Sequence, residues 1–286
     1  MMSPITVKLR GSLDQLNGAQ RAVADAILAD PEGTVTRTIA ELADIAGVSQ
    51  ASVVRLCRTL GLSGYPELRL ALAAEGGMRD PEEPAGDIAE GDELASVVRK
   101  MAQLDAQAVR DTAEFLDIAV LEKAIDALAA APRIDVYGVG ASAIVAADLS
   151  QKLTRIGRVA INYGDAHLGL TSAALLRPSD VAVAVSHSGA TTDTLDMLRT
   201  AAARGATTIA VTNFPASPLA RAADHTLITA ARETAFRAGA TASRLAQLVV
   251  IDCLFVGLAQ RTFSASQAAL EATWTAVQRR PKESPR

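Results

Sequence analysis

Apolar and polar positions follow different periods in the two parts of this 286-residue chain. From about residue 13 to residue 74, apolar residues recur only at helical spacing, and turn signals such as Ala46-Gly47 separate the helical stretches. After Pro132, short runs of β-branched residues alternate with helical patterns. Residues 1–75 therefore predict a compact all-α domain, and the later alternation predicts a parallel sheet covered by helices on both faces.

The second pattern predicts a three-layer α/β domain over residues 93–279, with a five-stranded parallel sheet. The strands are expected at residues 134–137, 159–162, 181–185, 207–211 and 226–228. Between the two domains, residues 76–92 combine glycines, prolines and acidic residues without apolar periodicity, which is typical of a linker. Residues 280–286 are expected to form a flexible tail.

The strongest local pattern lies within the all-α domain and is typical of a helix-turn-helix. Such a motif needs a small residue where its helices touch and a glycine at the turn, and Ala43 and Gly47 meet these demands. Ser49 is a natural N-cap for the second helix, so the residues that follow it are expected to face the major groove of DNA. The predicted DNA contacts are Thr38, Ser49, Gln50, Ala51, Ser52, Arg55 and Arg58. The alternative is a plain packing module in which Arg55 and Arg58 only solvate an exposed face.

Charge and cysteine content narrow the class of protein. The net charge of −4 gives no global affinity for a polyanion, so a DNA-binding surface must be local. A locally positive surface is possible in the all-α domain, because no acidic residue stands between Asp44 and Glu67. The two cysteines, Cys57 and Cys253, are far apart and suggest neither a disulfide nor a metal site. We expect a cytoplasmic protein without a membrane span, because the most apolar stretch, 245–259, is short and interrupted by polar residues.

Two strand-to-helix loops of the α/β domain carry the candidate ligand chemistry. The first strand leads into Gly138-Val139-Gly140-Ala141-Ser142, and the third into Ser186-His187-Ser188-Gly189-Ala190-Thr191. Glycines let the backbone approach a ligand, a helix N-terminus favours an anion, and hydroxyls are neutral donors to phosphate oxygens. Ligands of doubly wound sheets bind beyond the carboxyl ends of the strands, where these two loops can converge.

These loops resemble the sugar isomerase (SIS) domain, and residues 38–60 resemble the RpiR family of bacterial regulators. Further similar segments are residues 148–157, 213–219 and 243–248. The resemblance implies an SIS-like, flavodoxin-like winding and control of sugar-catabolic genes by a phosphorylated sugar. It also implies that Ser142, Ser186, Ser188 and Thr191 hold the phosphate. The ligand contacts expected beyond these are Gly140, His187, which shapes the loop or touches the sugar, and Glu233, which reaches sugar hydroxyls.

A phosphosugar isomerase is the main alternative function, and it would need a base that moves a proton next to a carbonyl. The candidates are His167, His187, His225, Asp165 and Glu233. Asp165 is expected to cap a helix, and none of the five makes a convincing acid–base pair. A DNA-binding regulator also needs no turnover, so we expect no catalysis and no cofactor.

A dinucleotide-sensing repressor is a lesser alternative, because Gly138, Gly140 and Ala143 satisfy the G-x-G-x-x-G/A fingerprint. That fingerprint expects an acid at the tip of the second strand, where Asn162 stands.

The expected assembly is a homodimer or homotetramer on a double-stranded DNA operator, since most helix-turn-helix proteins bind two-fold sites. The apolar helices over 245–259 and 267–277 are expected to pair the C-terminal domains.

Overall fold

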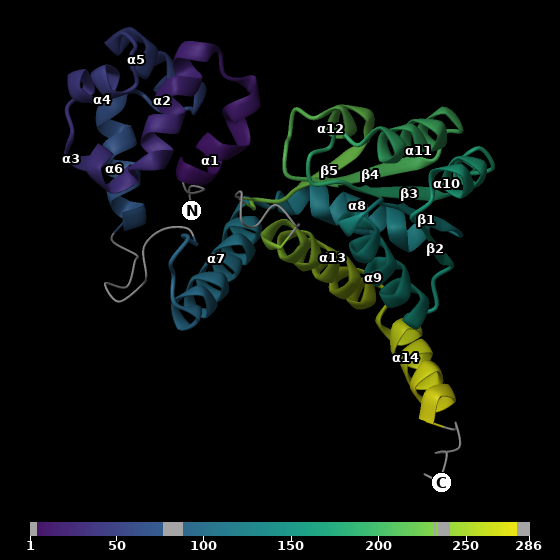
Figure 1. The fold of residues 1–286 in the computed structure, drawn as a ribbon. Helices are drawn as coiled ribbons and strands as arrows, with labels where there is room; N and C mark the ends of the chain where they lie inside the picture. The colour runs from purple at the N-terminus through teal and green to yellow at the C-terminus, as the bar shows by residue number, and fades with distance from the viewer. Residues whose placement is uncertain (1–4, 77–87, 232, 234–240, 279–286) are drawn as a thin grey trace. The chain divides into compact units, whose positions relative to one another are not determined.

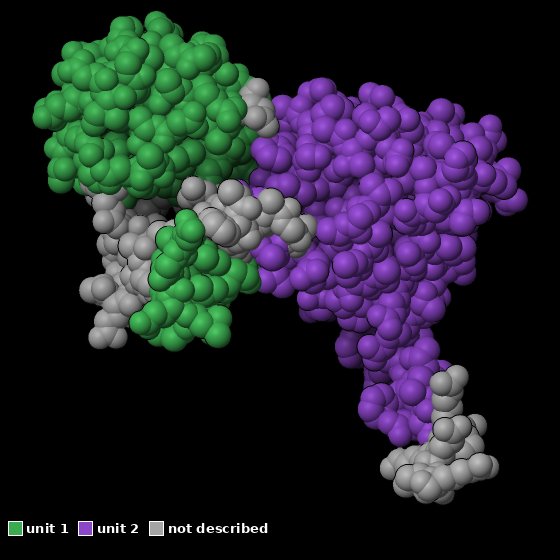
Figure 2. All heavy atoms as spheres, in the orientation of Figure 1, with its two compact units in different colours: residues 1–115 green, residues 116–286 purple. Residues whose placement is uncertain are grey.

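The computed structural model describes residues 5–76, 88–231, 233 and 241–278, which divide into two compact units, residues 1–115 and 116–286 (Figure 2). The division differs from the predicted one in one element. Helix α7 (Leu94–Phe115), which the sequence pattern assigned to the C-terminal domain, is grouped with the first unit. Most of the predicted linker and all of the predicted tail lie outside the described residues, so the boundaries at residues 75 and 92 stay predictions.

The first unit is all-α, as predicted. Its other helices are α1 (Ile5–Ser12), the short 3₁₀ helix η1 (Leu13–Gln15), α2 (Gly18–Ala29), α3 (Pro31–Thr36), α4 (Ile39–Ile45), α5 (Gln50–Thr59) and α6 (Tyr65–Gly76). Polar side chains cap the starts of α2 and α3: the Asn17 side chain accepts from the N–H of Gln20, and the Asp30 side chain accepts from the N–H of Gly33. Apolar side chains from these helices share one core.

The second unit contains the predicted five-stranded parallel sheet, with strand order β2-β1-β3-β4-β5. The strands are β1 (Ile134–Tyr137), β2 (Ala160–Tyr163), β3 (Val181–Val185), β4 (Thr207–Thr212) and β5 (His225–Ile228). Residues of β3 alternate between two cores, valines toward one face and alanines toward the other. The predicted fold class is confirmed, and β2 differs from its predicted range by one residue at each end.

Helices cover both faces of the sheet (Figure 1). One layer consists of α8 (Ile118–Ala130), α9 (Ala141–Arg155) and α13 (Ala242–Arg261), and the other of α10 (Ala166–Ala173), α11 (Thr192–Ala203) and α12 (Pro218–Ala222). Helix α14 (Phe263–Gln278) follows α13. Among the described residues, α13 is the one helix long and apolar enough to cross a membrane, but one of its faces is buried in the core of this unit.

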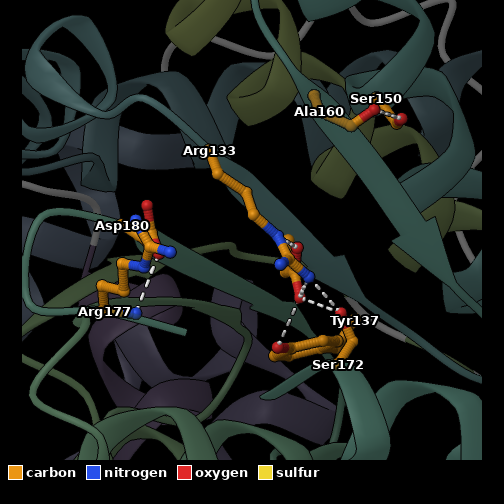
Figure 3. Close-up of polar contacts among 8 residues, drawn as sticks. Arg133, Tyr137, Ser150, Ala160, Ser172, Arg177 and Asp180 are labelled. Atoms are coloured by element: carbon orange, nitrogen blue, oxygen red, sulfur yellow. Dashed lines mark hydrogen bonds and ion pairs between the residues drawn. The ribbon is translucent and has the colours of Figure 1, made fainter. Parts of the chain in front are cut away.

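A buried carboxylate ties strand β1 to the layer of α10. Asp135 of β1 is fully buried and accepts from Arg133 Nε at 2.9 Å, from the Tyr137 hydroxyl at 3.2 Å and from the Ser172 hydroxyl at 2.5 Å (Figure 3). Figure 3 also shows Ser150 of α9, whose hydroxyl donates to the carbonyl of Ala160 in β2 at 2.9 Å. These bonds fix helices of opposite layers to β1 and β2.

Asp135→Asn should lower the free energy of unfolding by about 2–3 kcal/mol, because it leaves the Arg133 charge without its buried partner and turns an amide N–H₂ toward other donors. Urea unfolding measures this loss. Asp126→Asn is the matched control, since Asp126 forms an exposed ion pair with Arg261 and should change stability by less than about 0.5 kcal/mol. Equal losses in the two variants would show that the Asp135 contacts do not stabilise the sheet.

Candidate functional site

The helix-turn-helix begins with a capping box. The N–H of Thr38 donates to Glu41 Oε2 at 2.7 Å, and the N–H of Glu41 donates to Thr38 Oγ1 at 3.3 Å. The Thr38 bonds also lower the pKa of the Glu41 carboxyl. Thr38 is exposed, but its hydroxyl serves the start of α4 in this structure, and its predicted contact with DNA stays a prediction.

The turn between α4 and α5 has the geometry that the sequence indicated. Gly47 has a φ of +64°, a conformation in which a Cβ is strained, and Val48 then donates its N–H to the carbonyl of Ala43 at 2.9 Å. Ala43 is buried, which is consistent with its place where the two helices meet. The pair of helices is thereby held at a fixed angle.

Helix α5 presents most of the predicted DNA contacts. It begins at Gln50 with Ser49 at the N-cap, and Gln50, Ala51, Arg55 and Arg58 are exposed. Ser52 is different, because it is only 3% exposed. Its side chain is covered in this structure, and its predicted contact with DNA stays a prediction.

Ser52 is buried because it lies one position before Val53 and four before Leu56, on the stripe of α5 that packs into the core. Its hydroxyl accepts from Arg55 Nη2 at 2.8 Å and is bonded to the Ser49 hydroxyl at 3.2 Å. The Ser49 side chain makes no capping bond to the helix backbone. Ser52 thus holds the guanidinium of Arg55 near the start of the helix, and Ser49 bonds Ser52 in turn.

The two glycine- and serine-bearing loops leave the sheet at its topological switch point. Strands β1 and β3 are paired in parallel, with Tyr137 opposite Ala184, so both loops emerge at the same edge. The chain runs from β1 into α9 in one layer and from β3 into α11 in the other. This is the position at which doubly wound sheets bind ligands.

The β1 loop depends on its glycines. Gly140 is the N-cap of α9 with a φ of +58°, and a Cβ on Gly138 would come within 2.6 Å of the Ser142 carbonyl oxygen. Ser142 lies in the first turn of α9, where backbone N–H groups are free of helical partners. The helix begins two residues earlier than the expected start near Ala143.

Hydroxyls brace the β3 loop from within. The Ser186 hydroxyl accepts from the N–H of Gly189 at 3.1 Å and is bonded to the Thr191 hydroxyl, also at 3.1 Å. Ser188 is exposed, and its hydroxyl accepts from the N–H of Ala190 at 3.2 Å. Thr191 is the N-cap of α11 without a capping bond of its own. The loop is preformed, with the exposed Ser188 at its tip.

The end of β4 supports the β3 loop from behind. The carbonyl of His187 accepts from the Thr212 hydroxyl at 3.1 Å and from the N–H of Asn213 at 3.0 Å. The Asn213 side chain in turn accepts from the N–H of Ala231 at 2.7 Å. Sequence reasoning did not single out Thr212, and it noted Asn213 only within a similar segment; a polar pair that ends a buried strand is the signal that could have found them.

Glu233 lies between β5 and α13 in the chain and acts electrostatically on His187 of the β3 loop. One carboxylate oxygen accepts from the N–H of Ser243 at 2.8 Å, at the start of α13, and the other is buried without a hydrogen-bond partner in the described residues. Burial lowers the pKa of the His187 imidazole, and the nearby Glu233 carboxylate opposes part of that fall. The structure thus brings Glu233 and His187 into one electrostatic environment.

In the described residues, the remaining candidate bases form no hydrogen bond or ion pair with this cluster. Asp165 caps α10 by accepting from the N–H of Leu168 at 2.9 Å, as expected. His167 is exposed on α10, and His225 is half-buried in the edge strand β5, where exposure was expected. Asn162, in the opposite edge strand β2, is exposed.

Comparisons with known proteins agree with both halves of this structure. Residues 4–77 match the helix-turn-helix domain of the rpiR family, and residues 127–257 match the SIS domain. An uncharacterized HTH-type transcriptional regulator of Caldanaerobacter subterraneus subsp. tengcongensis is 39% identical over 272 residues, which is 95% of this chain and 96% of that protein.

Solved structures are similar to this chain, one over nearly its whole length and one over its C-terminal part. The Vibrio vulnificus NanR protein complexed with ManNAc-6P is 31% identical, with a TM-score of 0.61 over 96% of this chain and 97% of its own. The sugar isomerase domain of an RpiR transcription factor from Sphaerobacter thermophilus is 30% identical, with a TM-score of 0.56 over 60% and 96%. The resemblance seen in the sequence is confirmed: the chain belongs to the RpiR family of helix-turn-helix transcriptional regulators with a C-terminal SIS domain.

Proposed function

We propose that this regulator binds a DNA operator through α5 and that a phosphorylated sugar, bound at the β1 and β3 loops, controls its affinity for the operator. The observation that carries the proposal is the meeting of two hydroxyl-bearing loops at the switch point, each opening a helix. Helix N-termini and neutral hydroxyls suit a phosphate dianion and permit reversible binding. The NanR structure, which contains ManNAc-6P, supports this class of effector.

The phosphate contacts that we propose are Ser142, Ser186, Ser188 and Thr191, with the backbone at Gly140. Ser188 is exposed at the loop tip, whereas Ser186 and Thr191 are bonded to one another. Ser188 thus offers a hydroxyl to the ligand, and the inner pair keeps the loop in shape. His187 and Glu233 would face the sugar, since each has a buried polar atom without a hydrogen-bond partner in the described residues.

Control of DNA binding requires two states with different affinities for the effector. We propose that two or four copies assemble through α13 and α14 and so set the spacing of the DNA-binding units. The large apolar side chains Val256, Phe263, Trp274 and Val277 of these helices are exposed, which supports such pairing. A cytoplasmic location follows from binding to DNA.

Catalysis is not part of the proposal. An isomerase needs a base that moves a proton next to a carbonyl, usually with a partner that orients it, and no hydrogen bond joins His187 to Glu233 in the described residues. For a dinucleotide sensor, β2 offers Asn162 in place of the acid that binds a ribose hydroxyl. The relatives named as transcriptional regulators also favour sensing without turnover.

A thermal-shift screen tests the proposal against its alternatives. Phosphorylated sugars should raise the melting temperature, whereas unphosphorylated sugars and nicotinamide dinucleotides should not. A sensor should return its ligand unchanged, and conversion of the ligand would favour the isomerase.

Ser188→Ala should weaken the effector about tenfold, because it removes one neutral donor to the phosphate, and should leave operator binding unchanged. Ligand titration monitored by the melting temperature measures the effect. Ser179→Ala is the matched control, because Ser179 is exposed and lies just before β3, at the opposite end of this strand from the loop. A Ser188→Ala variant that responds at the wild-type ligand concentration would show that this loop does not hold the phosphate.

A further inference from the structure

Several buried polar atoms at the carboxyl edge of the sheet have no hydrogen-bond partner in the part of the chain that the structure describes. They are His187 Nδ1, Glu233 Oε2, Thr241 Oγ1 and Gln247 Nε2; a fifth such atom, Thr194 Oγ1, lies in α11. A native structure leaves few buried polar groups unpaired, because each has lost its water without gaining a bond. His187 belongs to the β3 loop, Glu233 acts electrostatically on it, and Thr241 and Gln247 flank Ser243, whose N–H donates to Glu233. Four such atoms linked in this way indicate a place where a polar ligand completes the bonding.

Gln247 is placed at this site by the start of α13. Glu233 accepts from the N–H of Ser243, and Gln247 follows Ser243 by four residues, so the two residues share one face of the helix. Both are only 2% exposed. The amide of Gln247 thus lies one turn along α13 from the point where Glu233 is held, and Glu233 acts electrostatically on His187 of the β3 loop.

After Gln247, the buried face of α13 carries only apolar side chains. Val250, Ile251, Leu254 and Leu258 continue it into the core. An apolar residue at position 247 would extend the core without an unpaired amide, so the amide is costly in the ligand-free protein. Its presence is explained if the bound effector supplies the missing acceptor.

We propose that Gln247 is a specificity-determining residue for the effector. Its amide donates to an oxygen on the carbon skeleton of a polyhydroxylated phosphate monoester, while Glu233 Oε2 accepts from a neighbouring O–H or N–H of the same ligand. This inference rests on the proposed function. It adds the two residues that would contact the carbon skeleton of the ligand and not its phosphate. Inorganic phosphate, which lacks a skeleton, makes neither contact.

Gln247→Leu in the full-length chain tests the proposal, since leucine has a similar volume and no polar atoms. The ligand-free variant should melt at a higher temperature than the wild type, because an unpaired buried amide is gone. Affinity for the tightest binder among N-acetylmannosamine 6-phosphate, glucose 6-phosphate and fructose 6-phosphate should fall about tenfold. Affinity for inorganic phosphate should stay the same. Gln151→Leu, on the exposed face of α9, is the control and should change neither affinity.

If Gln247 had only a structural role, the ligand-free Gln247→Leu variant would melt at a lower temperature than the wild type. The proposal is overturned if ligand-free Gln247→Leu melts lower than the wild type and keeps the wild-type ratio of sugar-phosphate to phosphate affinity. Gln247→Met, which is unbranched like glutamine, repeats the measurement if the leucine variant does not fold. A wild-type protein that binds none of the three sugar phosphates defeats the proposed function itself, whereas an unchanged ratio in a protein that binds them defeats only the role of Gln247.

Discussion

Replacing Arg55 with alanine is expected to weaken operator binding by about 10- to 100-fold, because Arg55 is the exposed cation at the centre of the face that α5 presents. Its guanidinium is held by Ser52 at 2.8 Å, so little side-chain freedom is lost when it meets DNA. Operator DNA selected from a randomised pool, titrated by fluorescence anisotropy at several salt concentrations, measures the effect. A contact to phosphate would lower the salt slope by about one, whereas a base contact would relax the sequence preference.

The matched control is Arg204→Ala, which removes the same charge from the exposed C-terminal end of α11. Binding of the effector should be unchanged in both variants. If the two variants bind the operator equally well, Arg55 does not contact DNA and α5 is not the reading helix. A loss in both would point to net charge rather than to a local surface.

Gly189→Ala is expected to abolish the effector response and to lower the free energy of unfolding by about 2–4 kcal/mol. Gly189 has a φ of +60°, and a Cβ there would lie 2.1 Å from Ser217 Oγ and 2.8 Å from Thr212 Oγ1. Because Thr212 also bonds the carbonyl of His187, relief of this clash must move the loop that is proposed to hold the phosphate. Urea unfolding and the ligand-induced rise in melting temperature measure the two effects.

Gly157→Ala is the control that has the backbone strain of a positive φ without the steric clash expected at Gly189. Gly157 has a φ of +79°, but a Cβ there would meet only Ala269 Cβ at 3.5 Å, an ordinary contact. We expect this control to lose about 1 kcal/mol and to keep the full effector response. A Gly189→Ala variant that matches it in both measurements would remove the structural basis of the proposed phosphate loop.

Features that depend on residues near each other in the chain could be predicted well. The range of β3 was predicted without error, because a run of valines and alanines bounded by Asp180 and Ser186 has no competing helical period. The start of α5 was also predicted, since Ser49 precedes a helical apolar stripe. The family resemblance rested on equally local patterns, and the comparisons confirmed it.

Features that depend on what packs against a residue could not be predicted in the same way. Ser52 is polar and follows the N-cap, which suggested exposure, yet it lies on the buried stripe of α5. Gln247 was read only as an interruption of an apolar stretch, and its importance comes from its position relative to Glu233. Helix α7 has a clear apolar period, but a period does not tell which domain the helix joins.

The order of residues alone thus determined the alternation of strands and helices, the start of α5, the two glycine-rich turns and the family, because backbone preferences and apolar periods act over a few residues. Tertiary structure decided that β1 and β3 are neighbours, that Thr212 and Asn213 bond the β3 loop, and that Glu233 and Gln247 keep buried polar atoms without a partner in the described residues. The reason is that strand pairing and burial join residues far apart in the chain, and no local pattern records their partners.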